Sequence, residues 1–258
     1  MKEKTALITG ATGGIGQEFA RILAQKGYRL ILIGRNKKKL QQLIKTLPTS
    51  SLKIQSFVCD FSEENDLVNL TKKIPNVDLL INNAGFSDYG LYSDLSWEKQ
   101  NKMIKVNINA LAYLCHYYLK GMLKRGSGQI LNVASTGGTK PSPFACCYTG
   151  TKAFVILFSQ SLALELKGTN ITVSCLLPGP TATEFWKEAG MSVKVEGKIN
   201  NFDKPNEVAK YGVQLLEKGQ ISGIYGFHNR SKQIIKNLLP EKIWFLLIRR
   251  HMLPKNLK

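Results

Sequence analysis

The chain has 258 residues, of which 43% are hydrophobic and 21% are charged, a balance that indicates a globular protein with a sizeable core. Lysine and arginine number 36 against 18 aspartates and glutamates, which gives a formal net charge of +18. This excess fits a phosphate-bearing ligand, a nucleic acid or an anionic membrane, and it equally fits a lysine-rich surface without a specific partner. We find no recognition-helix pattern and no basic sheet interleaved with aromatic residues, so nucleic acid is not an expected partner.

Cysteine usage and hydropathy exclude several other classes. The five cysteines are odd in number and lack C-x-x-C spacing, so we expect a reducing compartment, no disulfide framework and no metal site. No stretch approaches the ~20 apolar residues that span a bilayer. The chain enters a strand-like segment without a signal-peptide pattern, and a cytoplasmic protein is therefore expected.

Short apolar runs of the strand type alternate with helical patterns along the chain. These runs cover residues 6–8, 30–33, 54–58, 79–81, 130–133 and 171–177. Near-continuous apolar strands that alternate with helices indicate a parallel sheet covered on both faces. The expected fold class is α/β, a single-domain Rossmann-like doubly wound parallel sheet with helices on both faces, over residues 1–229.

A glycine-rich turn follows the first predicted strand. Gly10, Gly14 and Gly16 have the spacing G-x-x-x-G-x-G and precede a helical pattern. Glycine there lets the backbone turn tightly and approach a pyrophosphate, whose charge sits at the helix N-terminus. Such a turn can also be a plain strand-to-helix connection. Its place after the first strand favours a dinucleotide site that includes Gly10, Thr12, Gly14, Ile15 and Gly16.

Dinucleotide folds place the residue that reads the adenosine ribose about 20 residues beyond this turn. The chain has no carboxylate there, and Arg35 offers a planar, permanently charged group that suits a 2′-phosphate. This charge logic predicts NADP(H) as the cofactor. We interpret the neighbouring Lys37, Lys38 and Lys39 as the solvated start of a helix.

Tyr148 and Lys152 lie four residues apart at the start of a strongly helical segment, so both project from one face. A phenol titrates near ~10 in water, and a nearby ammonium is expected to lower that pKa and to make Tyr148 a general acid–base. The pair alone could be two exposed helix residues. Ser135 adds a hydroxyl just past a predicted strand, where open α/β sheets build their sites.

These pieces together resemble the short-chain dehydrogenase/reductase family over residues 1–227. The resemblance rests on motifs that stand in family order, namely the turn at residues 9–16, Asp60, Asn82-Asn83-Ala84-Gly85, Asn107, Ser135, Tyr148, Lys152 and Pro178-Gly179. The Ser-x12-Tyr-x3-Lys spacing is intact. The resemblance implies the fold predicted above and a hydride transfer between NADP(H) and a carbonyl or alcohol.

The resemblance also implies a role for each matched residue. Tyr148 would exchange the proton, Ser135 would orient the carbonyl, and Lys152 would bind the nicotinamide ribose. Asn107, from a kinked part of its helix, would hold a water that links Lys152 to solvent. Further implied cofactor contacts are Asp60, Asn83, Ala84, Gly85, Pro178, Gly179, Thr181 and Thr183. The alternative is a non-catalytic NADP(H)-binding sensor on the same fold, although such proteins usually lose the Tyr or Lys that this chain keeps.

Aromatic residues near the catalytic segment indicate an apolar substrate pocket. Phe144, Phe185 and Trp186 are the candidates, with Met191 and Val193 in the same region, and they could equally pack the loop on its own domain. A hydrophobic ketone, an acyl-type compound or a steroid-like compound would fit. Cys146 and Cys147 have no activating neighbour in sequence, and we interpret them as buried small side chains.

Residues 230–258 form a basic, amphipathic extension with eight basic residues and one acid, Glu241. Three interpretations stay open for this C-terminal tail: a peripheral membrane contact, a dimer or lid element over the substrate cleft, and a helix packed on the domain. Family members commonly pair through the helix after Tyr148. The resemblance therefore implies a homo-oligomer, either a dimer or a tetramer.

Overall fold

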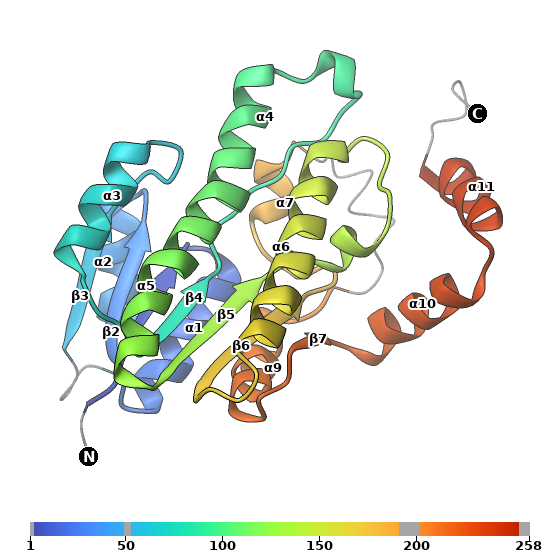
Figure 1. The fold of residues 1–258 in the computed structure, drawn as a ribbon. Coiled ribbons are helices and arrows are strands. Elements are labelled where there is room, and N and C mark those ends of the chain that lie inside the picture. The colour runs from blue at the N-terminus through green and yellow to red at the C-terminus, as the bar shows by residue number, and fades with distance from the viewer. Residues whose placement is uncertain (1–2, 49–52, 191–201, 253–258) are drawn as a thin grey trace.

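Seven parallel strands form the central sheet of the described part of the chain (Figure 1). The computed structural model describes residues 3–48, 53–190 and 202–252. The strands are β1 (Thr5–Thr9), β2 (Arg29–Gly34), β3 (Ile54–Val58), β4 (Leu79–Asn82), β5 (Gly128–Val133), β6 (Ile171–Leu177) and β7 (Ser222–Ile224). Their order in the sheet is β3-β2-β1-β4-β5-β6-β7, and every neighbouring pair is parallel. The predicted doubly wound sheet is confirmed.

Six of these strands coincide with the apolar runs predicted from the sequence, whereas β7 has no counterpart among them. β7 has three residues, and its first two, Ser222 and Gly223, leave no apolar run to detect. It pairs only with β6, at the edge of the sheet. Tertiary pairing, rather than local pattern, therefore makes this segment a strand.

Helices cover both faces of the sheet (Figure 1). They are α1 (Gly14–Gln25), α2 (Lys37–Thr46), α3 (Glu64–Lys73), α4 (Trp97–Ile104), α5 (Leu111–Arg125), α6 (Cys146–Glu165), α7 (Phe185–Glu188), α9 (Pro205–Glu217), α10 (Phe227–Leu238) and α11 (Glu241–Met252). Shorter helical segments are η1 (Tyr92–Asp94) and η3 (Thr136–Thr139), which are 3₁₀ turns, and η2 (Lys105–Ala110), a π-helical turn that joins α4 to α5.

The alternation of side chains along β1 explains how the sheet builds two cores. Successive strand residues point to opposite faces. Leu7 packs in the core under α3, α5 and α6, whereas Ala6 and Ile8 pack in the core under α1, α2 and α9. All three side chains are fully buried. Because helices cover both faces, β1 needs an uninterrupted apolar run, which is the pattern seen in the sequence.

The order of the strands reverses at β1. This strand pairs with β2 on one side and with β4 on the other. Loops at the carboxyl ends of strands diverge at such a switch point and leave a crevice, which is the usual ligand site of an open α/β sheet. The glycine turn after β1 and the segment after β4 meet there.

The C-terminal tail forms α10 and α11, which lie beyond the β7 edge of the sheet (Figure 1). Large apolar side chains stay exposed on both helices, among them Ile234, Leu238 and Leu246. Within the described ranges, no helix is both long enough and apolar enough to cross a membrane. A domain boundary at residue 229 stays a prediction, and α10 begins two residues earlier, at Phe227.

Candidate active site

A cleft of about 1210 Å³ opens at the switch point of the sheet. Ligand pockets usually hold about 300–1,000 Å³, so this cleft has room for a large ligand and a second molecule. The predicted cofactor residues that line it are Gly10, Thr12, Gly14, Ile15, Arg35, Asp60, Asn83, Ala84, Gly85, Tyr148, Lys152, Pro178, Gly179, Thr181 and Thr183. The predicted substrate residues Ser135, Phe144, Phe185 and Trp186 line it as well.

The glycines of the turn after β1 meet three different constraints. Gly10 has a φ of +61°, a conformation that L side chains rarely adopt. A Cβ at Gly14 would lie 2.5 Å from the Thr183 Cγ2 atom, so the segment after β6 packs directly on this turn. Gly16 does not line the cleft, and a Cβ there would lie 2.2 Å from the Gly10 carbonyl oxygen. The absence of a side chain at Gly16 lets α1 pack closely on the turn, and its role as a cofactor contact stays a prediction.

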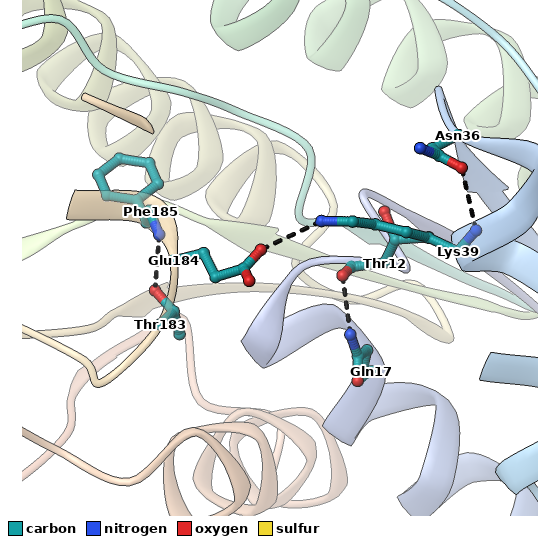
Figure 2. Close-up of polar contacts among 7 residues, drawn as sticks. All are labelled: Thr12, Gln17, Asn36, Lys39, Thr183, Glu184 and Phe185. Carbon is teal, nitrogen blue, oxygen red and sulfur yellow. Dashed lines mark hydrogen bonds and ion pairs between the residues drawn. The ribbon is translucent and has the colours of Figure 1, made fainter. Parts of the chain in front are cut away.

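The N-terminus of α1 offers an anion site to the cleft. The helix begins at Gly14, and its N-cap residue Gly13 supplies no side-chain hydrogen bond. The first backbone N–H groups of such a helix lack partners inside it, and the helix dipole adds partial positive charge. The Gln17 amide donates to the Thr12 carbonyl oxygen at 2.8 Å and braces the turn from within α1 (Figure 2). The arrangement fits a pyrophosphate.

Asn83 ties the segment after β4 to the turn after β1. Its side-chain amide donates to the carbonyl oxygens of Thr9 at 3.1 Å and of Gly10 at 3.0 Å. The backbone N–H groups of Asn83 and Ala84 both donate to the Thr9 hydroxyl at 2.9 Å. These four hydrogen bonds hold the two loops in register, so the floor of the cleft is braced before any ligand enters.

Charged side chains gather where β2 ends. Arg35 directly follows Gly34, the last residue of β2, and is exposed. Asp60 accepts hydrogen bonds from the Ser62 backbone N–H at 2.9 Å and from the Ser62 hydroxyl at 2.8 Å. Burial raises the pKa of Asp60, but these bonds and the positive charges of Arg35 and Lys102 outweigh it, and the pKa lies below its usual value.

Lys39 is exposed, as expected for the solvated start of α2, and it also contributes to the wall of the cleft. Its Nζ atom lies 3.1 Å from the Glu184 Oε2 atom, so an ion pair links α2 to the segment after β6 across the cleft (Figure 2). Asn36 starts this helix by accepting a hydrogen bond of 3.0 Å from the Lys39 backbone N–H. Both charged side chains are at least half exposed, and such pairs contribute only about 0–1 kcal/mol, so this link opens readily.

Ser135, Tyr148 and Lys152 meet at one place in the cleft. Ser135 follows β5, whereas Tyr148 and Lys152 lie in the first two turns of α6. A Cβ at Gly137 would lie 3.3 Å from the Ser135 Oγ atom and 3.7 Å from the Tyr148 Cε1 atom, so the two side chains lie beside the same glycine. The Lys152 Nζ atom lies 5.9 Å from the centre of the Tyr148 ring and donates to the Val133 carbonyl oxygen at 2.8 Å. A carbonyl group bound here would face a hydroxyl and a phenol at once.

Burial moves the pKa values of Tyr148 and Lys152 in opposite directions. It raises the pKa of Tyr148 to about 12, and an interaction with the Ser135 side chain opposes this only in part. It lowers the pKa of Lys152 to about 8. The prediction that the Lys152 ammonium lowers the pKa of Tyr148 is therefore wrong for this structure, because desolvation of the phenol is the larger effect.

Asn107 lies in the π-helical turn η2 and is 1% exposed. Its amide nitrogen donates to the Phe86 carbonyl oxygen at 3.0 Å and to the Thr151 hydroxyl at 3.1 Å, and its oxygen accepts from the Phe86 N–H at 3.1 Å. Asn107 thus connects η2 to α6 one residue before Lys152. A Cβ at Gly85 would lie 3.0 Å from the Asn107 Oδ1 atom and 3.4 Å from the Lys152 Nζ atom, so Gly85 keeps the space beside both side chains open. Asn107 itself does not line the cleft.

Aromatic rings surround the position beside Tyr148. The Phe185 ring centre lies 5.7 Å from that of Tyr148, and the Phe144 ring centre lies 5.6 Å from that of Tyr89. Phe144 has a φ of +68°, which is costly for a bulky residue and accompanies functional sites more often than plain loops. The indole N–H of Trp186 donates to the Thr181 carbonyl oxygen at 2.9 Å, so this ring also fixes the segment before α7. The predicted residues Met191 and Val193 lie outside the described residues.

Several residues of the cleft wall were not predicted. Among them are Gln17, Lys39, Tyr89, Lys140, Thr149, Asn229, Lys232, Gln233, Lys236 and Trp244. The tail residues among them lie more than 75 residues beyond Tyr148, and no local motif marks them. The cysteines before Tyr148 are a further correction, because Cys146 is exposed and Cys147 is partly exposed rather than buried. They lie at the rim where α6 begins.

A nucleotide-sized cleft with a glycine turn, an anion site and a Ser-Tyr-Lys trio defines a dinucleotide-dependent oxidoreductase. The model of the short chain dehydrogenase family matches residues 4–193. The chain is 34% identical to the uncharacterized oxidoreductase YvaG of Bacillus subtilis over 94% of this chain and 87% of that protein. It is 33% identical to the 3-oxoacyl-[acyl-carrier-protein] reductase FabG of Rickettsia typhi over 86% of this chain and 92% of that protein.

Among solved structures, a short-chain dehydrogenase from Sphingobium yanoikuyae in complex with NADPH matches with a TM-score of 0.82 and 28% identity. The match covers 92% of this chain and 96% of that one. The protein belongs to the short-chain dehydrogenase/reductase family and is an oxidoreductase.

Proposed function

We propose that the protein is an NADP(H)-dependent carbonyl reductase, with alcohol oxidation as the formal reverse reaction. Its substrate would be a hydrophobic ketone, a steroid-like compound or an acyl-type compound. The observation that carries the proposal is that Ser135, Tyr148 and Lys152 converge on one cleft. Arg35 lines another part of the same cleft. One cavity thus holds both a proton donor and a cation for a phosphate.

The residues present fit NADPH along the length of the cleft. The N-terminus of α1 would hold the pyrophosphate, and Gly14 leaves no side chain in its way. Arg35 would bind the 2′-phosphate, because its guanidinium is always charged and matches phosphate geometry. Lys39 would add a second cation after releasing Glu184. The NADPH found in the Sphingobium yanoikuyae relative supports the same choice.

NADPH, when bound, supplies the hydride for the carbonyl carbon. Tyr148 donates the proton to the carbonyl oxygen, and its raised pKa keeps the phenol protonated throughout the neutral range. Ser135 donates a hydrogen bond to the same oxygen and orients it. The Lys152 ammonium stabilises the phenolate that Tyr148 becomes, while Asn107 holds α6 against η2. The protonated phenol is the form that carbonyl reduction uses, whereas alcohol oxidation uses the phenolate.

The test is NADPH consumption with a panel of aldehydes, ketones and acyl compounds, run beside Tyr148→Phe. We expect the variant to bind NADPH as the wild type does and to lose at least about a hundredfold in kcat, the usual contribution of a general acid. If the wild type binds NADPH but turns over nothing in the panel, the non-catalytic sensor is the better explanation. An active Tyr148→Phe variant would contradict the assigned proton donor.

Two further features belong to this proposal. The tail, residues 230–258, acts as a lid on the catalytic domain of residues 1–229, since α10 and α11 contribute to the wall of the cleft.

The protein also forms a homo-oligomer through α6, where Phe154, Leu157 and Leu164 are 37%, 66% and 60% exposed. Apolar side chains exposed along one helix are typical of an interface. We assign the protein to the cytoplasm for its free cysteines.

A further inference from the structure

The tail closes the end of the cleft that lies past the catalytic trio. α10 contributes Asn229, Lys232, Gln233 and Lys236 to the wall, and α11 contributes Trp244. A hydrogen bond of 2.8 Å joins the Thr139 hydroxyl to the Gln233 side chain. Thr139 ends η3, the turn whose N-cap is Ser135. The tail is therefore attached next to the catalytic serine, and its side chains face the space where a substrate would extend.

Three lysines bring positive charge to this end of the cleft. Lys140 follows η3, and Lys232 and Lys236 lie one turn apart on α10, so they share a face. Burial lowers the pKa of Lys140, and the charges of Lys232 and Lys236 lower it further, which places all three ammonium groups within electrostatic reach. The ion pairs found in the described part of the chain involve none of the three.

Acidic side chains do not offset this charge. In the described ranges, the carboxylates that line the cleft are Asp60, Glu184 and Glu188. Asp60 is held by Ser62 beyond the ends of β2 and β3, and Glu184 pairs with Lys39. Of these three described carboxylates, that leaves Glu188, which is exposed on α7. Clustered ammonium groups repel one another, so an anion bound among them is favoured.

An unpartnered polar group lies in the same region. The Trp244 Nε1 atom is buried and has no hydrogen-bond partner among the described residues. The Lys140 Nζ atom lies 5.7 Å from the centre of the Trp244 ring, so this indole belongs to the lysine cluster. An indole nitrogen can only donate a hydrogen bond, and leaving it unpaired is unfavourable. Its missing partner is an acceptor, and an anionic oxygen is the strongest one.

We propose that the substrate is an apolar carbonyl compound that carries an anionic group, a carboxylate or a phosphate, at the end remote from the carbonyl. Lys140, Lys232 and Lys236 bind this group, with the Trp244 N–H as a further donor. Phe185 and Phe144 contact the apolar part between the anion and Tyr148. The inference rests on the proposed reductase function and specifies its substrate class.

The cofactor phosphates do not account for these lysines. Arg35 and the α1 N-terminus follow β2 and β1, whereas Lys140 follows β5 and the tail lies beyond β7. In the sheet order, β2 and β5 stand on opposite sides of the switch between β1 and β4. The cleft therefore has one cationic region after β2 and another after β5, and the residues proposed to hold the cofactor phosphates lie on the β2 and β1 side.

The experiment compares substrates that have the same carbon chain and differ in the charge of the group remote from the carbonyl. Methyl-ketone carboxylic acids of increasing length are assayed for NADPH oxidation beside their methyl esters and beside ketone phosphates of the same length. In the wild type we expect kcat/KM for at least one acid or phosphate to exceed that of its ester about tenfold, as for one well-formed charged hydrogen bond. The Lys232→Gln/Lys236→Gln double variant should lower this charged-to-neutral ratio about tenfold, and Lys140→Gln should lower it as well. Lys242→Gln, on α11 but outside the cleft wall, should leave the ratio unchanged.

The possible outcomes distinguish a failure of the anionic subsite from a failure of the proposed reductase function. If neutral esters are reduced as fast as the acids and phosphates, the anionic subsite is wrong while the reductase stands. If no ketone of the series is reduced, both the reductase and the subsite fail for this class. The dissociation constant of NADPH, from its fluorescence, is a second readout: a tenfold weakening in the double variant would assign the lysines to the cofactor and overturn the inference. The preference for acids over phosphates identifies the anion.

Discussion

Replacing Lys152 with methionine removes a buried ammonium and keeps the length of the side chain, and its effect on stability should depend on pH. Lys152 is 5% exposed, and burial lowers its pKa from 10.5 to about 8. Because each tenfold change in proton affinity is worth about 1.4 kcal/mol, this depression corresponds to about 3 kcal/mol. The folded protein is therefore destabilised by this amount when Lys152 is charged, and it is not destabilised in this way when Lys152 is neutral.

The sign follows from the protons bound by each state. Between pH 8 and pH 10.5 the unfolded chain holds a proton on Lys152 that the folded protein has released. The free energy of unfolding of the wild type, relative to Lys152→Met, should therefore rise with pH through this window. The stability of the wild type relative to Lys152→Met reaches its full value above pH 10.5, and this advantage is lost as the pH falls through about 8. Changes in packing shift the whole difference curve without bending it.

Urea unfolding of both proteins from pH 7 to about pH 11, with m-values compared, measures this difference. Titrations elsewhere in the chain are common to both proteins and cancel, except that of Cys175, whose charge interacts with that of Lys152. Lys242→Met, on the exposed surface of α11, is the matched control and should give a flat difference. A flat difference for Lys152→Met would refute the reasoning, because it would mean that the buried lysine keeps its ordinary pKa.

Three further predictions concern the cofactor, the glycine turn and assembly. Arg35→Asp should weaken NADPH binding at least about tenfold and spare NADH in fluorescence titrations; equal loss of both would contradict the 2′-phosphate assignment. Gly16→Ala should cost about 1–3 kcal/mol in urea unfolding, because its Cβ meets a carbonyl oxygen. Gly150→Ala, with open space around its Cβ, is the control and should not destabilise α6. Leu157→Glu, at a position 66% exposed, should dissociate the oligomer in light scattering, and a monomeric wild type would overturn that interface.

Local pattern was enough for most of the fold. A strand buried on both faces must be apolar throughout, and this requirement is visible in the run around Leu7 without any structure. The strand β7 was not predicted, because Ser222 and Gly223 carry no such pattern and become a strand only by pairing with β6. The placement of Ser135, Tyr148 and Lys152 in one cleft also follows from motif order, since each lies at or near the carboxyl end of the sheet.

Long-range contacts decided what the sequence pattern could not. Lys39 is a solvated helix residue, as its local pattern indicates, but that pattern does not show its ion pair with Glu184, which lies 145 positions away. The tail composition left a lid, an interface and a membrane contact open, and only the folded chain brings Lys236 to the cleft wall.

The sequence by itself determined the class of fold, the order of the candidate catalytic residues and the cationic residue after β2, because hydrophobic periodicity and motif spacing are properties of neighbouring residues. Only the tertiary structure decided the pKa of Tyr148. Desolvation raises this pKa, whereas a nearby ammonium was expected to lower it. It also decided the charge at the far end of the cleft, where Lys140 meets two lysines of α10. Burial and electrostatic interaction depend on distances in space, and folding brings together groups that the chain keeps far apart.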